Sequence, residues 1–145
     1  MTKITELIAH AKSERTEYKE HEFGFIPNWQ SQQILQITQI RVHGVKKILT
    51  SDVIRHIFKE HGNNKDQGER GQMGITDADI EKIPNIVANF DSVEKANPKH
   101  GKSVLFIKEI NGISYRVAMK LLGNQGDPKL EVRTMFAKPI KKAGV

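Results

Sequence analysis

Residues 103–122, SVLFIKEINGISYRVAMKLL, decide the fold that the sequence predicts. Two runs that alternate apolar and polar residues flank Asn111-Gly112, the strongest short-range signal for a β-hairpin. When Ile110 pairs with Ile113, one face of the hairpin is apolar and should meet the helices. That face carries Val104, Phe106, Ile110, Ile113, Tyr115, Val117 and Met119, with Lys108 among them. The opposite face is mixed and basic, so we expect phosphate to bind there: Ser103, Leu105, Ile107, Glu109, Ser114, Arg116, Ala118 and Lys120.

The segments around this hairpin predict helices first and strands last. Apolar spacing predicts a helix whose stripe covers only the first turns after residue 2, and a second helix over about 28–38. A short strand should end at a Ser51 cap, which starts a third helix, and Thr76 and Pro84 should open two further short helices. A last strand is expected over 130–137. This order predicts an α+β fold in which N-terminal helices pack on a twisted antiparallel sheet of about four strands.

Composition limits the class of protein. The 145-residue chain suits one main domain and contains no cysteine, so it has no disulfide framework and no thiolate chemistry. It has no apolar run near 18 residues and no signal-peptide pattern, which predicts a soluble chain. We expect a helical extension over 1–22, a main domain over 23–140 and a basic tail over 141–145.

The net charge of +6 is unevenly distributed. Residues 1–100 carry 14 basic and 14 acidic residues, whereas residues 101–145 carry nine basic against three acidic ones. The whole excess therefore lies in the last third of the chain. Such clustering is typical of a surface that binds a polyanion, although it is also common on an ordinary solvated face.

The stretch IRHIFKEHGN, residues 54–63, places two histidines on one helix. His61 projects near the centre of the helix's apolar arc, and His56 projects well outside it. Two histidines that bind zinc from one helix are spaced four residues apart, as in HExxH. Here the spacing is five, so no metal site is expected. The alternatives to a catalytic role are a core histidine at the helix end for His61 and a solvated surface residue for His56.

The stretch 63–74 that follows is rich in glycine and poor in apolar residues. It predicts a mobile loop of the length that usually serves a function, and we expect its Arg70 to contact substrate.

The segments LTSDVIRHIFKEHGN (49–63), GQMGITDADIEKIPNIVANFD (71–91) and VRTMF (132–136), with a Lys-bearing strand and NG between the last two, carry a family resemblance. Over about residues 22–138 the chain resembles the phage-associated barnase, EndoU, colicin and RelE-like (PBECR) nuclease domains. These occur in MuF-type phage head proteins and in polymorphic and contact-dependent toxins. The resemblance implies metal-independent ribonuclease chemistry without a cofactor.

The resemblance also implies roles for particular residues. His56 and His61 match the family's HIxxxHG signature, and Thr134 matches its hydroxyl position. In a regular strand, however, Thr134 shares a face with Leu130, Val132 and Phe136, where it would be an ordinary strand residue. Arg116 is the fourth candidate catalytic residue, because a guanidinium can stabilise the charge of the transition state. The candidate RNA-binding residues are Arg55, Lys59, Arg70, Lys108, Lys120, Arg133 and Lys138.

One conflict arises among these candidates. His61 projects toward the helix core, whereas Arg116 lies on the open face of the sheet. Either the helix ends before His61, or the site forms at a sheet edge where both side chains can meet.

The leading functional hypothesis is a toxin-type endoribonuclease that cleaves structured RNA such as tRNA. The 2′-hydroxyl would attack, with histidine as acid and base. The alternative is a non-catalytic nucleic-acid-binding or partner-binding module of the same fold, and a metal-dependent DNase ranks third. A toxin would need an acidic immunity protein to cover the basic sheet. It would act in the cytoplasm of a target or host bacterium, and delivery within a larger secreted or virion protein is one route.

Overall fold

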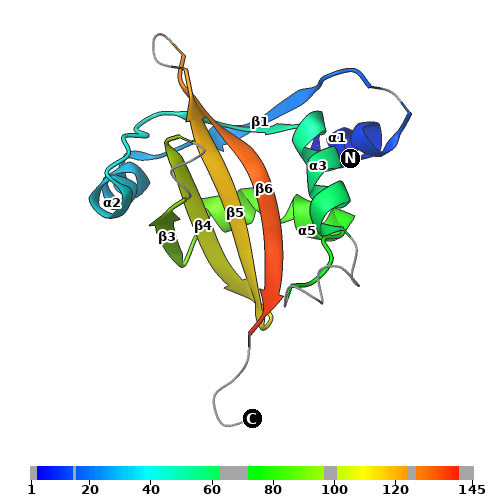
Figure 1. Cartoon of the computed structure of the whole chain (residues 1–145). Coiled ribbons are helices and arrows are strands. Elements are labelled where there is room, and N and C mark those ends of the chain that lie inside the picture. Colours follow the sequence, from blue (N-terminus) through cyan, green and yellow to red (C-terminus); the bar gives the residue numbers. More distant parts are fainter. Residues whose placement is uncertain (1–2, 15, 63–71, 97–100, 124–126, 141–145) are drawn as a thin grey trace.

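The structure, a computed structural model, describes residues 3–14, 16–62, 72–96, 101–123 and 127–140. These residues form a six-stranded sheet in the order β1-β2-β6-β5-β4-β3 (Figure 1). Neighbouring strands are antiparallel, except that β2 and β6 run parallel. The α+β class is confirmed, and the expected number of about four antiparallel strands is too low. The strands are β1 (Glu20–Phe25), β2 (Lys46–Thr50), β3 (Ser92–Lys95), β4 (Ser103–Ile110), β5 (Ile113–Leu122) and β6 (Lys129–Pro139).

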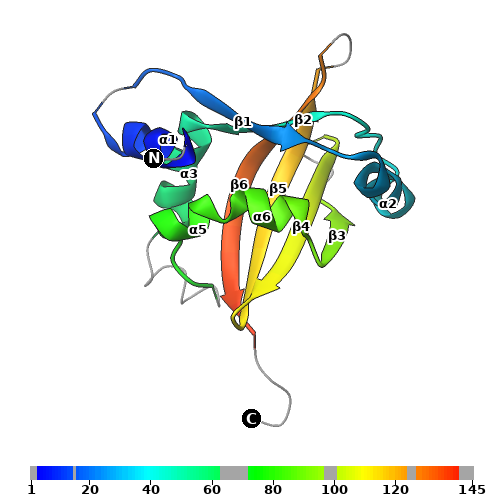
Figure 2. The ribbon, with the colours of Figure 1, turned by 180° about the vertical axis from the view of Figure 1, so that it is seen from behind.

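The helices leave one face of β4–β6 open. In Figure 2, α5 and α6 cross the back of these strands, whereas Figure 1 shows the other face with α3 beside β6. α1 packs against α3, and α2 lies near β3 at the opposite end of the sheet. The open face is therefore flanked by helices without being covered by them. The helices are α1 (Lys3–Lys12), α2 (Asn28–Thr38), α3 (Ser51–His61), α5 (Asp77–Glu81) and α6 (Ile83–Ala88).

The hairpin forms in the predicted register, with Ile110 opposite Ile113. Asn111 and Gly112 have φ values of 53° and 78°, the positive pair that the type I′ hairpin turn requires. The predicted apolar face is the core face of the sheet, where five of its residues pack with α5 and α6. These five buried side chains are Val104, Phe106, Tyr115, Val117 and Met119.

The two strands that sequence analysis missed, β1 and β3, are the edges of the sheet. β3 contains a single buried residue, Val93, and β1 contains no buried residue. Edge strands of this kind are held by backbone pairing to a neighbour more than by their own apolar pattern. The pairs Val93–Phe106 and His21–Leu49 supply that neighbour.

The N-cap of α3 is Thr50, one residue earlier than expected. Its Oγ1 accepts a hydrogen bond from the amide of Val53 at 3.1 Å. Ser51 instead uses its hydroxyl to accept from the amide of Lys19 at 2.9 Å. Ser51 thereby fixes the segment before β1 to the start of α3, next to the open face.

Asp79 connects α5 to the sheet. Its carboxylate accepts from the Thr76 amide at 2.9 Å, which completes a capping box, and from the Tyr115 hydroxyl at 2.8 Å. Burial opposes ionisation of Asp79, but these hydrogen bonds outweigh it and hold its pKa below the ordinary 3.8. Burial and the same carboxylate raise the pKa of Tyr115 to about 12.

Asp79→Ala should lower the free energy of unfolding at neutral pH by about 2 kcal/mol, because it removes a cap and an ionic hydrogen bond. Since the pKa is lower in the folded state, the ionic contribution is complete above the unfolded value and disappears as pH falls through the folded one. Urea unfolding of both proteins should therefore show their stabilities converging in acid. Asp77→Ala is the matched control, because the exposed Asp77–Lys12 ion pair should contribute less than about 1 kcal/mol. An equal loss in both variants would contradict the role of Asp79.

The first residues belong to the same core as the rest. Ile4, Leu7, Ile8 and Ala11 of α1 are buried in it. The proposed boundaries at 22 and 140 stay predictions, and the tail over 141–145 lies outside the described residues. Among the helices described, none is long and apolar enough to cross a membrane.

Candidate active site on the open face of the sheet

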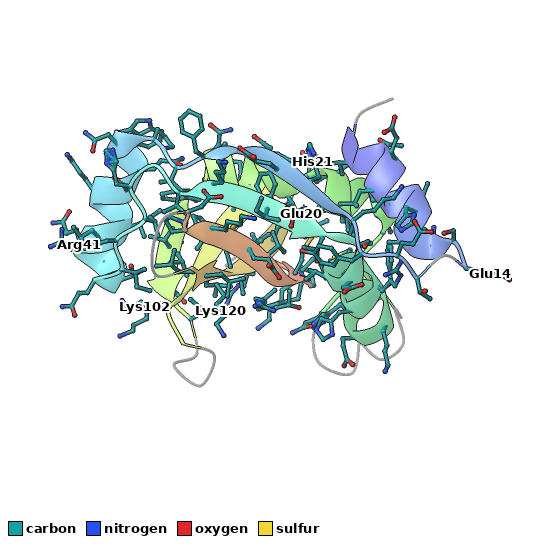
Figure 3. The ribbon with its side chains drawn as sticks, turned by 90° about the horizontal axis from the view of Figure 1, so that it is seen from above. Glu14, Glu20, His21, Arg41, Lys102 and Lys120 are labelled. Atoms are coloured by element: carbon teal, nitrogen blue, oxygen red, sulfur yellow. The ribbon has the colours of Figure 1, made fainter. Side chains whose placement is uncertain are left out.

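A pocket of about 550 Å³ lies between the first turns of α3 and the open face of β4–β6. The surface predicted for phosphate contributes its floor, and the N-terminal half of α3 contributes a wall. Figure 3 shows Lys120 on the side of the sheet away from α5 and α6, near Lys102. The lining residues are Tyr18, Thr50, Asp52, Val53, His56, Ala96, Ser103, Ala118, Lys120, Glu131, Arg133 and Thr134.

A β-bulge in β6 shapes the floor of the pocket. Val132 pairs with Met119 and Thr134 pairs with Ala118, so Arg133 is an extra residue in the ladder. Val132 is fully buried in the core, whereas Arg133 and Thr134 both line the pocket. The expectation that Thr134 shares a face with Val132 is therefore wrong, because a bulge reverses the alternation of side chains beyond it. Bulges often re-aim a side chain beside an active site in this way.

The Thr134 hydroxyl has an unmet hydrogen-bonding need. Its Oγ1 is buried, and no partner for it is found within the described part of the chain. Buried polar atoms almost always have a partner, and an exception calls for an explanation such as a water or a ligand. Because Thr134 lines the pocket, a ligand there can supply the partner.

His56 reaches the pocket from α3, one turn after Val53. The apolar face of α3 is buried through Val53, Ile54 and Ile57, which leaves His56 exposed, as the helical projection predicts. No hydrogen-bond partner of its ring is found among residues whose positions are described. The solvated side of α3 and the open face of the sheet thus meet at this imidazole.

Charges of both signs line the pocket. Arg133 Nη1 lies 3.6 Å from Glu131 Oε1, and Lys120 is opposite Glu131 in the β5–β6 register. Asp52 is engaged by Arg55, whose Nη1 is 2.9 Å from Asp52 Oδ1. The Glu131 carboxylate therefore has two cationic side chains as neighbours. A phosphate that binds in the pocket can pair with these cations, Arg133 and Lys120.

Tyr18 lies at the rim, where its hydroxyl donates to Glu20 at 2.9 Å. Desolvation and this hydrogen bond raise the pKa of Tyr18 to about 12. At neutral pH it remains a phenol, so it adds a hydroxyl to the pocket and no negative charge.

His61 and Arg116 meet at a second position on the open face, around Phe136 of β6. The His61 and Phe136 ring centroids are 6.0 Å apart, and the Arg116 guanidinium carbon is also 6.0 Å from the Phe136 centroid. α3 includes His61 and lies beside β6, so these two side chains approach one aromatic ring from different elements. The helix does not end before His61, and the two side chains meet at Phe136 of β6, an inner strand in the sheet order. Neither residue lines the pocket that contains His56.

The other candidate RNA-binding residues are spread over the molecule. Lys138 places Nζ 5.8 Å from the Phe136 centroid, and exposed Lys59 lies one turn from His56 on α3. Arg55 donates to the Ala11 carbonyl as well as to Asp52, and so links α1 to α3. Lys108 lies away from the open face, 3.5 Å from Asp91. Arg70, with most of the predicted loop, lies outside the described residues.

Sequence analysis missed Tyr18, Asp52 and Glu131 as lining residues, whereas Ser103 lies on the face that it predicted for phosphate. Only Glu131 had a usable signal, since it alternates with the buried Leu130 and Val132 and so had to face the open side of β6. The positions of Tyr18 and Asp52 depend on how β1 and α3 pack. Within the described ranges, no three His, Asp or Glu side chains group in a way that could hold a metal ion.

A pocket with two cations, a histidine, two carboxylates and a buried hydroxyl, on the open face of β4–β6, is a candidate phosphodiester-cleaving site. The comparison with protein families agrees with this class. The family model described as phage-Barnase-EndoU-ColicinE5/D-RelE like nuclease 3 matches residues 24–143, and the chain belongs to this nuclease family. Comparisons with curated proteins and with solved structures found no match.

Proposed function

We propose that this nuclease is a metal-independent endoribonuclease whose active site is the pocket between α3 and β6. One observation carries the proposal: the bulge at Arg133 places a cation, and a hydroxyl without a partner in the described ranges, in one pocket with His56 and Glu131. These are the groups that RNA cleavage by its own 2′-hydroxyl requires, namely a proton acceptor, a proton donor and cations for the phosphate.

In this proposal each group has a separate task. Glu131 takes the proton from the attacking 2′-hydroxyl, and protonated His56 gives a proton to the leaving 5′-oxygen. Arg133 and Lys120 stabilise the negative charge that gathers on the phosphate oxygens. The Thr134 hydroxyl donates to one of those oxygens, which gives Oγ1 a partner that the described residues do not supply.

The position of His61 modifies the assignment made from sequence. Because His61 does not line the pocket, we place it at Phe136, next to the reaction centre, and Glu131 takes its proton-transfer role. Arg116 likewise moves from the scissile phosphate to the neighbouring nucleotide.

Structured RNA such as tRNA is the substrate that we propose, on the basis of the toxin-type resemblance and the basic open face. An acidic inhibitor protein would compete for Lys120, Arg133, Arg116 and Lys138, which all lie on that face or at its bulge. Association of such an inhibitor should be faster at low salt.

The test is cleavage of a short RNA in EDTA, with the same sequence carrying a single 2′-deoxy residue at the cut position as control. We expect fragments with 2′,3′-cyclic phosphate ends from the RNA and no cleavage of the substituted strand. Salt-dependent binding without cleavage would instead support the non-catalytic module. Cleavage that requires Mg²⁺ and ignores the 2′-deoxy substitution would support a metal-dependent nuclease.

A further inference from the structure

Phe136 is the centre of a cluster on the open face that the proposed reaction does not use. The ring is partly buried, and three basic side chains surround it. His61 approaches from α3 at 6.0 Å between ring centroids, with the ring planes inclined by 32°. Arg116 of β5 and Lys138 of β6 place their cationic groups 6.0 and 5.8 Å from the Phe136 centroid.

Arg116 of this cluster has a hydrogen-bond donor without a partner in the described residues. It is opposite Phe136 in the β5–β6 register, so both side chains leave the same face of the sheet. Its Nε is buried, and no partner for it is found among the described residues. A guanidinium that stacks near an aromatic ring and keeps a free donor is suited to a flat ligand with acceptor atoms at its edge.

The cluster is next to the pocket along β6. Thr134 and Phe136 are two residues apart and face the same side, which corresponds to about 6.8 Å along a strand. Phosphates repeat about every 3.4 Å along a stacked strand, and a nucleotide whose base is unstacked extends farther, so about one nucleotide can cover this separation. A chain with its phosphate at Thr134 can therefore bring a neighbouring nucleotide to Phe136.

We propose that Phe136, Arg116, Lys138 and His61 form a nucleobase-binding subsite. It would take one unstacked base of single-stranded RNA, adjacent to the scissile phosphate. The base stacks on the accessible side of the ring, and Arg116 Nε donates to an acceptor at the base edge. Lys138 pairs with the backbone phosphate. This inference rests on the proposed function, because that function places the phosphate at Thr134. Recognition of unstacked bases by aromatic and arginine side chains is the usual mode for single-stranded RNA.

A fluorescence experiment tests stacking separately from cleavage. Trp29, the chain's one tryptophan, is replaced by phenylalanine, and Phe136→Trp then puts the only indole at the subsite. Titration with a non-cleavable 2′-deoxy oligonucleotide should quench this emission, and an abasic residue at one position should prevent quenching. The unmodified protein is the control, because exposed Trp29 lies on α2 and its emission should not change.

Kinetics supply the second measurement. Phe136→Leu should raise KM for RNA about tenfold with little change in kcat, and Phe136→Tyr should restore KM. Cleavage by the unmodified protein without quenching or a KM effect would overturn the subsite and leave the proposed function standing. Quenching without cleavage by any form of the protein would overturn the proposed function and leave the base-binding subsite standing. Quenching by the abasic strand would also overturn the subsite, because it would show that phosphate alone is bound.

Discussion

His56→Ala should lower the rate of RNA cleavage by at least about 100-fold. Within the described part of the chain, the imidazole is the one histidine ring that lines the pocket, and a positioned acid or base contributes about 100-fold to 10,000-fold to such reactions. Its exposed position on α3 means that removing it leaves no cavity in the core. Stability should therefore change by less than about 0.5 kcal/mol. Initial rates on a short RNA and urea unfolding of the same preparations check both parts.

His43→Ala is the matched control for this experiment. His43 is also exposed, but it lies before β2 and lines a separate pocket beside α2. It should keep full activity. Lys59→Ala, one turn from His56 on the same helix, should weaken binding modestly without abolishing cleavage. Normal cleavage by His56→Ala would move the active site elsewhere on the molecule.

The hairpin and the helix starts could be predicted because local chemistry determines them. Asn111-Gly112 adopts one of the tight two-residue turns that join antiparallel strands, and Thr76 and Pro84 begin helices through their own side chains and ring. The core face followed from the hairpin register alone. These features depend on residues close together in sequence.

The edge strands and the pocket could not be predicted in the same way. β3 becomes a strand because β4 offers it a free edge, and its own sequence, SVEK, has one apolar residue. The pocket joins Tyr18, α3 and three strands, whose approach depends on packing over the whole chain. The family resemblance indicated His56 and Thr134, which line the pocket. It gave no indication that His61 lies outside the pocket, at the ring of Phe136.

The bulge in β6 causes the largest difference between the structure and the regular alternation of side chains predicted for this strand. A regular strand would place Thr134 with Val132 in the core, and every later residue of β6 would face the wrong side. With one extra residue, Thr134, Phe136 and Lys138 all face the open side while Met135 and Ala137 stay buried. A single insertion thus builds both the floor of the pocket and the cluster at Phe136.

Deletion of Arg133 should leave the protein folded and lower cleavage by about 100-fold or more. Two residues, Arg133 and Thr134, oppose Ala118. Removal of either one therefore leaves a regular ladder in which Val132 stays opposite Met119 and Met135 stays opposite Val117. Without Arg133 the ladder keeps Thr134 on the open face but loses a cation for the transition state, and such donors contribute about 100-fold to 1,000-fold. Deletion of Thr134 should fold equally well and keep the arginine in its place.

Deletion of both residues is the control that tests the role of parity. It would put Met135 opposite Ala118 and turn Phe136 and Lys138 toward the core, which buries a charge and exposes core side chains. Thermal melts followed by circular dichroism should show cooperative unfolding for each single deletion and none for the double deletion. Full activity after deletion of Arg133 would remove this residue from the proposed site. Loss of folding in both single deletions would instead show that the bulge is needed for the sheet itself, because the bend it gives to β6 would then be what lets α3 pack beside the strand.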